Sequence, residues 1–176
     1  IAKGLGAGYQ PIGAMICSAT IYEVIESGTG FFQHGHSYLG HPVAAAAALA
    51  VVKELLSKNL INRSKVMGEK LQKALLEKLG QHRHVGDIRG RGLFRGIELV
   101  SDRTAKTPFA PELRIASKIK AAAFDVGLLC YPMSGTRDGK WGDHVLLAPP
   151  FILLDKHVDE IVIKLSGAID IALSAS

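Results

Sequence analysis

The residues with the clearest chemical potential are a lysine and the glycines that follow it. The chain begins Ile-Ala-Lys-Gly-Leu-Gly-Ala-Gly, so Lys3 stands at the end of a short apolar run and at the entry of a glycine-rich turn. A lysine amine is a nucleophile near neutral pH only where burial or a neighbouring cation disfavours its charged form. An apolar strand end is such a place, which makes Lys3 the candidate for the chemistry. The alternative is an exposed lysine at the edge of a loop, since lysines are mostly exposed.

A histidine-rich segment offers a second kind of site. Residues 34–42 read His-Gly-His-Ser-Tyr-Leu-Gly-His-Pro and lead into an alanine-rich stretch. A hydroxyl and successive backbone N–H groups in a glycine-bounded turn ahead of a helix can hold phosphate oxygens, and Ser37 supplies the hydroxyl. We predict no metal here, because nothing fixes His34, His36 and His41 on one helix face and no carboxylate or cysteine stands at ligand spacing.

Two other glycine-containing segments have competing interpretations. The glycines at positions 4, 6 and 8 suggest a dinucleotide fingerprint, but that motif needs a following helix, and residues 9–11 lead into a strand pattern. Residues 89–92, Arg-Gly-Arg-Gly, look like a basic nucleic-acid loop. They lie between two strand patterns, however, with glycines where a tight turn needs them, so we predict a structural turn.

The elements that must position these residues follow from the hydropathy pattern. Residues 11–21 are small, apolar and β-branched, which predicts a buried strand, and residues 22–26 predict a short helix. A helix with a deeply buried start is expected from Pro42 to about residue 58. In a second helix, ending before Gly80, apolar residues recur every fourth position at Met67, Leu71, Leu75 and Leu79.

Beyond residue 80 the pattern changes to short strands, expected at 85–88, 93–100, 128–131 and 145–148, with helices at 112–126 and 155–173. Strands that alternate with helices after a long connecting helix predict an α/β fold with a second, smaller domain. We place the domain boundary near residues 58–65, inside the helical connection.

Composition narrows the function classes. The 176 residues are 48% hydrophobic and 21% charged, as in ordinary globular proteins. The net charge of +5 comes from scattered basic residues without an aromatic stripe, which argues against nucleic acid. Cys17 and Cys130 lie in apolar surroundings and predict small core residues in a reducing compartment. With no apolar run of ~18 residues and no signal peptide, we expect a cytoplasmic protein that does not span a membrane.

Four blocks, at residues 1–8, 34–42, 85–93 and 141–150, together resemble the class III pyridoxal-phosphate-dependent aminotransferases, the group that includes the ω-aminotransferases. The resemblance covers essentially the whole chain, which starts inside a motif and is therefore expected to be a fragment. It implies the tail of a fold-type I large domain, residues 1–57, followed by a small C-terminal α/β domain, residues 58–176. It also implies pyridoxal 5'-phosphate (PLP) as cofactor, amine and keto-acid substrates, and a homodimer or higher homo-oligomer.

The resemblance also implies roles for individual residues. Lys3 matches the Schiff-base lysine, which also carries the substrate's Cα proton to the cofactor. Ser37 matches a position, usually threonine, that reaches the cofactor phosphate of the neighbouring subunit. His36 stands where the family often has an aromatic residue, and its backbone N–H is expected to contribute to cofactor binding. The family's pyridine-nitrogen carboxylate, ring-stacking aromatic residue and main phosphate loop precede its lysine and lie outside this chain.

Substrate preference depends on where an arginine stands, because its planar fork binds a carboxylate through two parallel hydrogen bonds. Family members acting on ornithine-like substrates carry one just before Ala-Pro-Pro, where this chain has Leu146. That departure resembles the amine:pyruvate branch, whose arginine comes from the preceding loop, and Arg137 is the candidate; a solvated loop arginine is the alternative. The predicted activity is transamination between a primary amine or amino acid and a keto acid such as pyruvate. An aminomutase or racemase, or a catalytically silent dimerisation module, are the alternatives.

Overall fold

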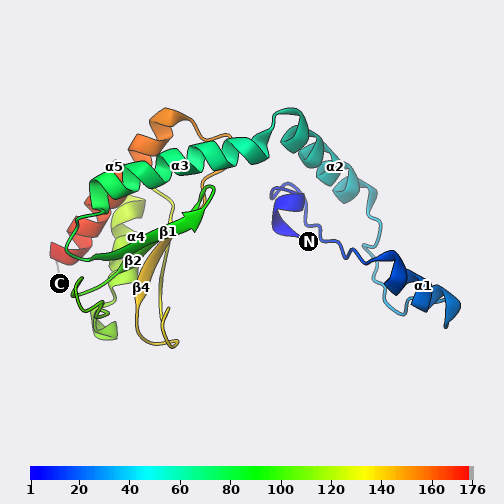
Figure 1. The fold of residues 1–176 in the computed structure, drawn as a ribbon, viewed down its shortest axis with the longest axis horizontal. Coiled ribbons are helices and arrows are strands. Elements are labelled where there is room, and N and C mark those ends of the chain that lie inside the picture. The colour runs from blue at the N-terminus through cyan, green and yellow to red at the C-terminus, as the bar shows by residue number, and fades with distance from the viewer. Residues whose placement is uncertain (175–176) are drawn as a thin grey trace. The chain divides into compact units, whose positions relative to one another are not determined.

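The computed structural model describes residues 1–174 (Figure 1). The chain forms two units, and the boundary between them in the sequence falls between Leu60 and Ile61. This division falls inside the interval of residues 58–65 predicted for the boundary. That the units are the end of a large domain and a small C-terminal domain stays a prediction. Each unit is described by itself.

The first unit contains a single 3-10 turn and two helices: η1 (Lys3–Leu5), α1 (Ala19–Ser27) and α2 (Pro42–Ser57). The start of each helix is set by a capping side chain. Ser18 Oγ accepts the N–H of Ile21 at 3.4 Å, and His41 Nδ1 accepts the N–H of Ala44 at 3.3 Å. Pro42 then occupies the first turn of α2, where its missing N–H costs no hydrogen bond.

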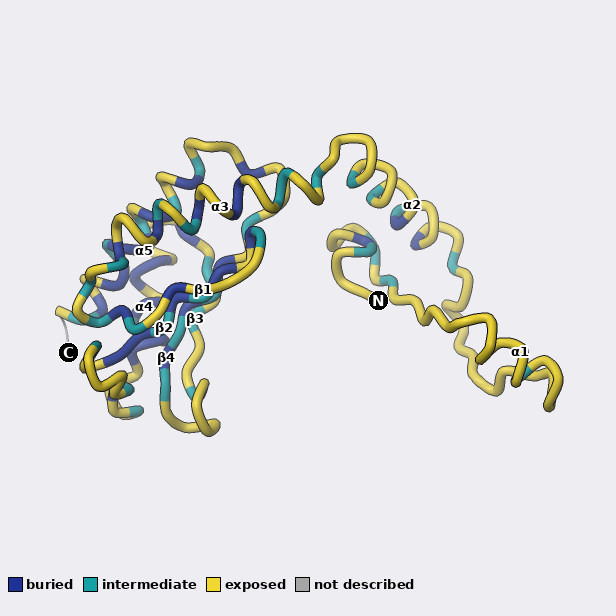
Figure 2. Tube along the Cα trace, in the orientation of Figure 1, coloured by how far each residue is buried: buried dark blue, intermediate teal, exposed yellow. Residues whose placement is uncertain are grey.

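Three predictions for the first unit are wrong. Residues 11–21 do not form a buried strand: residues 11–18 have no regular structure, and α1 begins at Ala19. A strand requires a partner for its backbone groups, and within the described residues this segment gains only a contact of Ala14 with Ile1. Cys17 is exposed rather than in a core. The start of α2 is not deeply buried either: Val43 is 57% exposed, and Ala44 is the one buried residue among the first four of the helix. Figure 2 shows that most of α2 is exposed.

The second unit is built on a four-stranded antiparallel sheet of strand order β1-β2-β4-β3. Its strands are β1 (Val85–Arg91), β2 (Phe94–Leu99), β3 (Tyr131–Ser134) and β4 (Asp143–Leu147), and its helical elements are α3 (Leu60–Leu79), η2 (Pro111–Leu113), α4 (Ile115–Asp125) and α5 (Asp155–Ser174). This mixture of helices and strands confirms the predicted α/β class.

One core holds the second unit together. Alternate residues of the two inner strands are buried, among them Ile97 and Leu99 of β2 and Val145 and Leu147 of β4. The four α3 residues predicted from their every-fourth spacing, Met67, Leu71, Leu75 and Leu79, join the same cluster together with residues of α4 and α5. The amphipathic pattern and the end of α3 before Gly80 are therefore confirmed, while Cys130 packs partly buried against this core.

The strand boundaries differ from the predicted ones by a few residues. The third strand is displaced to Tyr131–Ser134, and the helix expected from residue 112 is interrupted at Arg114, which has φ +51°. The predicted turn is confirmed as the two-residue turn Gly92-Leu93 between β1 and β2, with Gly92 at φ +55°. The arginines of that segment lie in β1 rather than in the turn.

The β1 edge of the sheet is covered by side chains. Arg95 is 7% exposed, and its two Nη atoms donate to the carbonyls of Gly90 and Gly68, each at 2.8 Å. Gln72 Nε2 donates to the carbonyl of Ile88 at 3.0 Å, and Lys106 Nζ donates to that of Gly86. Alternate carbonyls of an edge strand point away from the sheet and can accept hydrogen bonds from another strand. Here the side chains of Arg95, Gln72 and Lys106 donate to these carbonyls instead.

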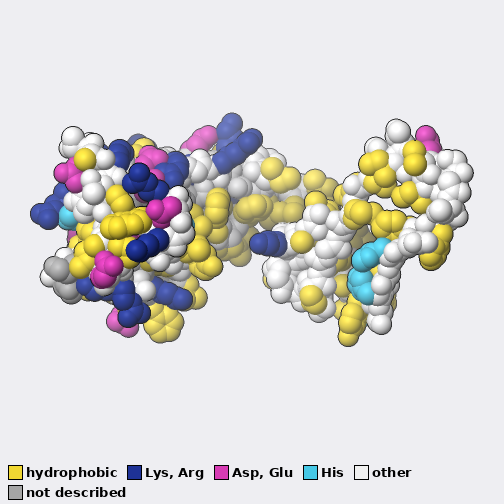
Figure 3. All heavy atoms as spheres, turned by 90° about the horizontal axis from the view of Figure 1, so that it is seen from below, with side chains coloured by type: hydrophobic (Ala, Val, Ile, Leu, Met, Phe, Trp, Pro, Cys, Tyr) yellow, Lys and Arg dark blue, Asp and Glu magenta, His cyan; other side chains and the backbone are white. Residues whose placement is uncertain are grey.

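Basic residues are distributed unevenly between the units. Lys3, Lys53 and Lys58 are the lysines and arginines among the first 60 residues, and the other basic residues belong to the second unit (Figure 3). Exposed aromatic side chains occur in both units, for example Tyr38 at 74% in the first and Phe124 at 68% in the second. Across residues 1–174, no helix is both long and apolar enough to cross a membrane.

Candidate active site

Lys3 lies in the one-turn helix η1 and not at a strand end as predicted. Ala2 before it is extended, whereas Lys3 itself has φ +51° in the left-handed region that favours glycine. The turn is closed by hydrogen bonds from Leu5 N–H to Ala2 O and from Gly6 N–H to Lys3 O, both at 3.2 Å. A non-glycine residue held in this region is strained, and such strain concentrates at functional sites.

An open pocket of about 600 Å³ adjoins Lys3, a volume in the range of small-molecule sites. Its lining residues come from the glycine-rich turn and the segment after it: Lys3, Gly4, Ala7, Gly8, Gln10, Pro11 and Ile12. The chain can fold back here because Gly6 has no side chain; a Cβ there would lie 2.7 Å from the carbonyl oxygen of Gln10.

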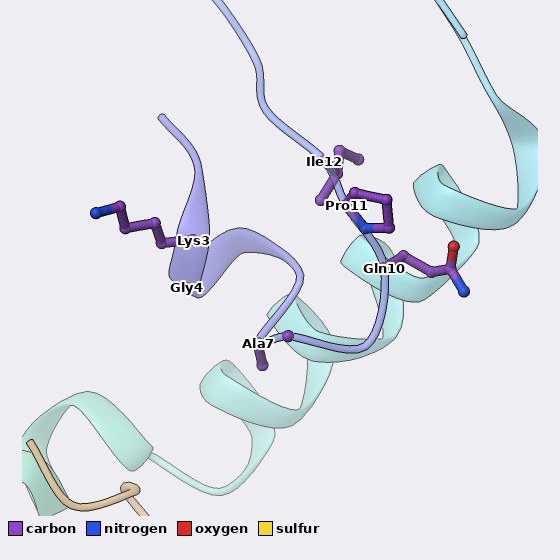
Figure 4. Close-up of a pocket in the computed structure, with 7 residues that line it drawn as sticks. Lys3, Gly4, Ala7, Gln10, Pro11 and Ile12 are labelled. Atoms are coloured by element: carbon purple, nitrogen blue, oxygen red, sulfur yellow. The ribbon is translucent and has the colours of Figure 1, made fainter.

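The amine of Lys3 is free of protein partners within residues 1–174, since Nζ has neither a hydrogen bond nor an ion pair there. In Figure 4 its side chain extends away from Gln10 and Pro11 on the other side of the pocket. The side chain is exposed, so the burial expected from an apolar strand end is wrong for this chain taken alone. The glycine-rich turn thus presents an accessible primary amine.

Ser37 lies in a turn that spans residues 37–40. Two backbone bonds close this turn, from Leu39 N–H to His36 O at 3.0 Å and from His41 N–H to Tyr38 O at 3.2 Å. Tyr38 N–H also donates to Nδ1 of His36, at 3.2 Å. Within the described chain this leaves the hydroxyl of Ser37, and the N–H groups of His36 and Ser37, without partners. These are the donors that an anion needs.

The helix N-terminus beside this turn is already partly used. His41 caps α2 through its imidazole. This capping role was not among the functions predicted for His41 from the sequence. The signal was present in Pro42, which marks the first turn of a helix. Neither His36 nor Ser37 lines the pocket next to Lys3. No metal-binding group of three or more His, Cys, Asp or Glu residues occurs in the part of the chain that the structure describes.

Arg137 lies in the second unit, on the loop that joins β3 to β4. Its N–H donates to Trp141 O at 2.9 Å, and the carboxylate of Asp138 accepts the N–H groups of Trp141 and Lys140 at 2.8 and 3.0 Å. These two backbone bonds hold the pKa of Asp138 below its usual value. The guanidinium of Arg137 is exposed, and it has no hydrogen bond or ion pair within residues 1–174.

Most other arginines of the second unit are occupied. Arg89 of β1 lies between the carboxylates of Glu98 and Asp87, at 2.5 and 2.8 Å, and the two hydrogen bonds raise its pKa. Arg63 donates to the carbonyls of Phe151 and Leu153 at 3.1 and 2.5 Å. Arg137 is therefore one of the few arginines whose charged head is available to a ligand.

His144 of β4 lies near the Arg137 loop. Its Nδ1 is 2.5 Å from Thr136 Oγ1. Partial burial lowers the pKa of His144, and the nearby charge of Arg89 lowers it further, so the neutral imidazole is favoured. The spacing of two residues places Leu146 on the same face of β4, opposite Gly96 of β2.

The class-III aminotransferase family model matches residues 1–169. An aminotransferase of Gibberella zeae is 41% identical over 174 residues, which are 98% of this chain and 34% of that protein. The crystal structure of a transaminase from the marine bacterium Virgibacillus superposes with a TM-score of 0.91 at 32% identity, covering 99% of this chain and 39% of that one.

A PMP-bound aminotransferase from Vibrio fluvialis superposes with a TM-score of 0.87 at 30% identity, covering 98% of this chain and 37% of that one. This chain spans 34% to 38% of the length of the first curated relatives that it matches.

Proposed function

The chain belongs to the class-III aminotransferases, and we propose that the protein uses PLP to transfer an amino group between a primary amine or amino acid and a keto acid such as pyruvate. The observation that carries this proposal is the free amine of Lys3 on a glycine-rich turn beside a pocket, in a chain matched by the family model over residues 1–169. The transaminase relatives support the reaction class.

Two groups of the first unit suit the two ends of PLP, which are an aldehyde that reacts with amines and a phosphate that accepts hydrogen bonds. Lys3 offers a primary amine without competing partners, and the turn around Ser37 offers a hydroxyl and free N–H groups. When bound, PLP supplies an electron sink that acidifies the substrate's Cα–H. The PMP-bound structure of the Vibrio fluvialis relative supports PLP as the cofactor.

Lys3 has two tasks in this proposal. Its Nζ would hold the cofactor at the aldehyde. The same amine, when free, would be the base that takes the proton from the substrate's Cα and returns it during amino transfer. Because Lys3 is exposed in this chain, we expect bound cofactor and neighbouring protein to give the cover that a lysine base needs.

Ser37 and the backbone N–H of His36 bind the phosphate across the interface of a homodimer. Both residues lie outside the pocket that contains Lys3, as expected if they serve the cofactor of the other subunit. A hydroxyl and an N–H group directed at phosphate oxygens make charge-assisted hydrogen bonds. The turn leaves both donors free to do so.

Arg137 binds the substrate carboxylate. Its backbone is fixed by the loop, and its guanidinium has no partner within the described residues, so both parallel hydrogen bonds remain available. Leu146 has an uncharged side chain and cannot bind a carboxylate in this way.

Transfer of isotope tests the activity. The holoprotein is incubated with a ¹⁵N-labelled primary amine and pyruvate, and the products are analysed by mass spectrometry. We expect ¹⁵N-alanine and the carbonyl product of the amine in equal amounts. Racemised or rearranged amine without labelled alanine would indicate a racemase or mutase, and no turnover would indicate a catalytically silent chain; either result contradicts the proposal.

A further inference from the structure

A contact between two side chains fastens the loop of Arg137 to the sheet. Thr136 Oγ1 lies 2.5 Å from His144 Nδ1 and 3.3 Å from the carbonyl oxygen of Gly142. The carbonyl can only accept, so the Thr136 hydroxyl is the donor in its contact with Gly142 O, whereas the tautomer of the imidazole decides which atom donates between Oγ1 and Nδ1 of His144. His144 is in register with Glu98 of β2 and faces β3 on its other side, so it anchors the loop to an inner strand.

The loop is also closed within itself. Besides the bonds of Arg137 and Asp138 to Trp141, Thr136 N–H donates to Gly142 O at 3.2 Å. Gly142 has φ +92°, and a Cβ there would lie 3.3 Å from the Cβ of Thr136 and 3.4 Å from the nitrogen of Arg137. The backbone on both sides of Arg137 therefore has one defined position, set by residues that are adjacent in the turn.

The guanidinium at the end of this fixed backbone is free, as described above. A binding arginine whose main chain is already ordered loses less conformational freedom when it takes a ligand, and it presents its fork in the required direction. The backbone bonds fix the shape of the turn, whereas the Thr136–His144 contact fixes its orientation on the sheet.

We propose that Thr136 and His144 are positioning residues that orient Arg137 toward the carboxylate of the keto-acid substrate. The inference rests on the proposed function, because it requires Arg137 to bind that carboxylate. It assigns a role in substrate affinity to two side chains that do not themselves touch the substrate.

Steady-state kinetics of the holoprotein test this inference. Thr136→Val removes the hydroxyl and keeps the shape of the side chain, and loss of one hydrogen bond corresponds to a rise of about 2- to 10-fold in the KM for pyruvate. We expect little change in kcat and a smaller change in the KM for an amine without a carboxylate, and Thr136→Ser should restore the KM for pyruvate. His144→Asn, whose amide has both a donor and an acceptor to offer Thr136 Oγ1, should be closer to the parent than His144→Leu.

A double-mutant cycle with Arg137→Ala separates this inference from the proposed contact. If the contact operates through Arg137, Thr136→Val has no further effect on the KM for pyruvate in the Arg137→Ala background. The positioning role is overturned if Thr136→Val raises the KM equally in both backgrounds, or if it does not raise the KM although Arg137→Ala does. Either result leaves the contact of Arg137 with the carboxylate intact. An unchanged KM for Arg137→Ala overturns the contact and the positioning role together, while labelled alanine would still report transamination.

Discussion

Replacing Gly68 of α3 with alanine should destabilise the second unit, although alanine is the better helix former. The helix passes over the β1–β2 turn so closely that a Cβ at position 68 would lie 2.0 Å from the carbonyl oxygen of Gly92 and 2.2 Å from its carbonyl carbon. Both atoms belong to the backbone, so no side chain can rotate away. The helix or the turn must move, and Arg95, which donates to the Gly68 carbonyl, must move with them.

The magnitude follows from two opposing effects. Alanine gains about 1 kcal/mol over glycine in a helix interior, whereas forcing an extra carbon into a packed contact costs about 1–3 kcal/mol. The upper value applies here because the contact is with backbone, so we expect a net loss of about 2 kcal/mol. Gly167 of α5 is the matched control: nothing lies within 4 Å of a Cβ there, so Gly167→Ala should gain stability from helix propensity alone.

Native-state hydrogen exchange measures both changes locally and does not depend on how other parts of the protein unfold. Amides of α3 and of the β1–β2 hairpin should exchange on the order of 30-fold faster in Gly68→Ala, and those of α5 should exchange more slowly in Gly167→Ala. Equal or slower exchange of α3 in Gly68→Ala would refute the reasoning, because it would mean that α3 does not approach the turn at this distance.

Three further predictions concern charge, phosphate and the sheet edge. Burial raises the pKa of Asp143, so the folded protein loses stability as pH rises and this carboxyl ionises. Asp143→Asn keeps an oxygen that accepts the N–H of Ala116 but cannot ionise, so the melting temperature of the variant relative to the parent should rise from about pH 4 upward. A difference in melting temperature that does not change with pH would contradict this assignment. Ser37→Ala should weaken PLP binding by ~1.5 to 3 kcal/mol in a cofactor titration while Ser37→Thr retains it, and equal affinity in all three proteins would exclude the contact. Gln72→Ala leaves the carbonyl of Ile88 without its side-chain donor and should lower the free energy of unfolding by about 1 kcal/mol in urea denaturation. An unchanged free energy of unfolding would contradict a stabilising role for this hydrogen bond.

Local patterns predicted the second unit well because neighbouring residues determine them. The spacing of Met67, Leu71, Leu75 and Leu79 identifies both the helix and its buried face, and Gly80 marks its end. The turn at Gly92 follows from the conformational freedom of glycine between two strand patterns. These features depend on side-chain periodicity and turn chemistry, which the sequence carries directly.

Features that depend on a distant partner could not be predicted. The β-branched residues near Cys17 suit a strand, but a strand forms only where another pairs with it, and the described chain provides none there. The left-handed conformation of Lys3 is equally invisible in the sequence, although its glycine-rich turn is not. The contact of Thr136 with His144 joins residues eight positions apart that match no motif, and only the pairing of β3 with β4 brings them together.

The most direct test of the central claim is to find the lysine that carries the cofactor. The holoprotein is reduced with borohydride, which fixes the cofactor to its lysine, then digested and analysed by mass spectrometry. We predict that the modified peptide contains Lys3, and that Lys3→Ala abolishes the labelling while Lys53→Ala, a matched change elsewhere in the first unit, does not. A reduced cofactor on any lysine other than Lys3 would contradict the account.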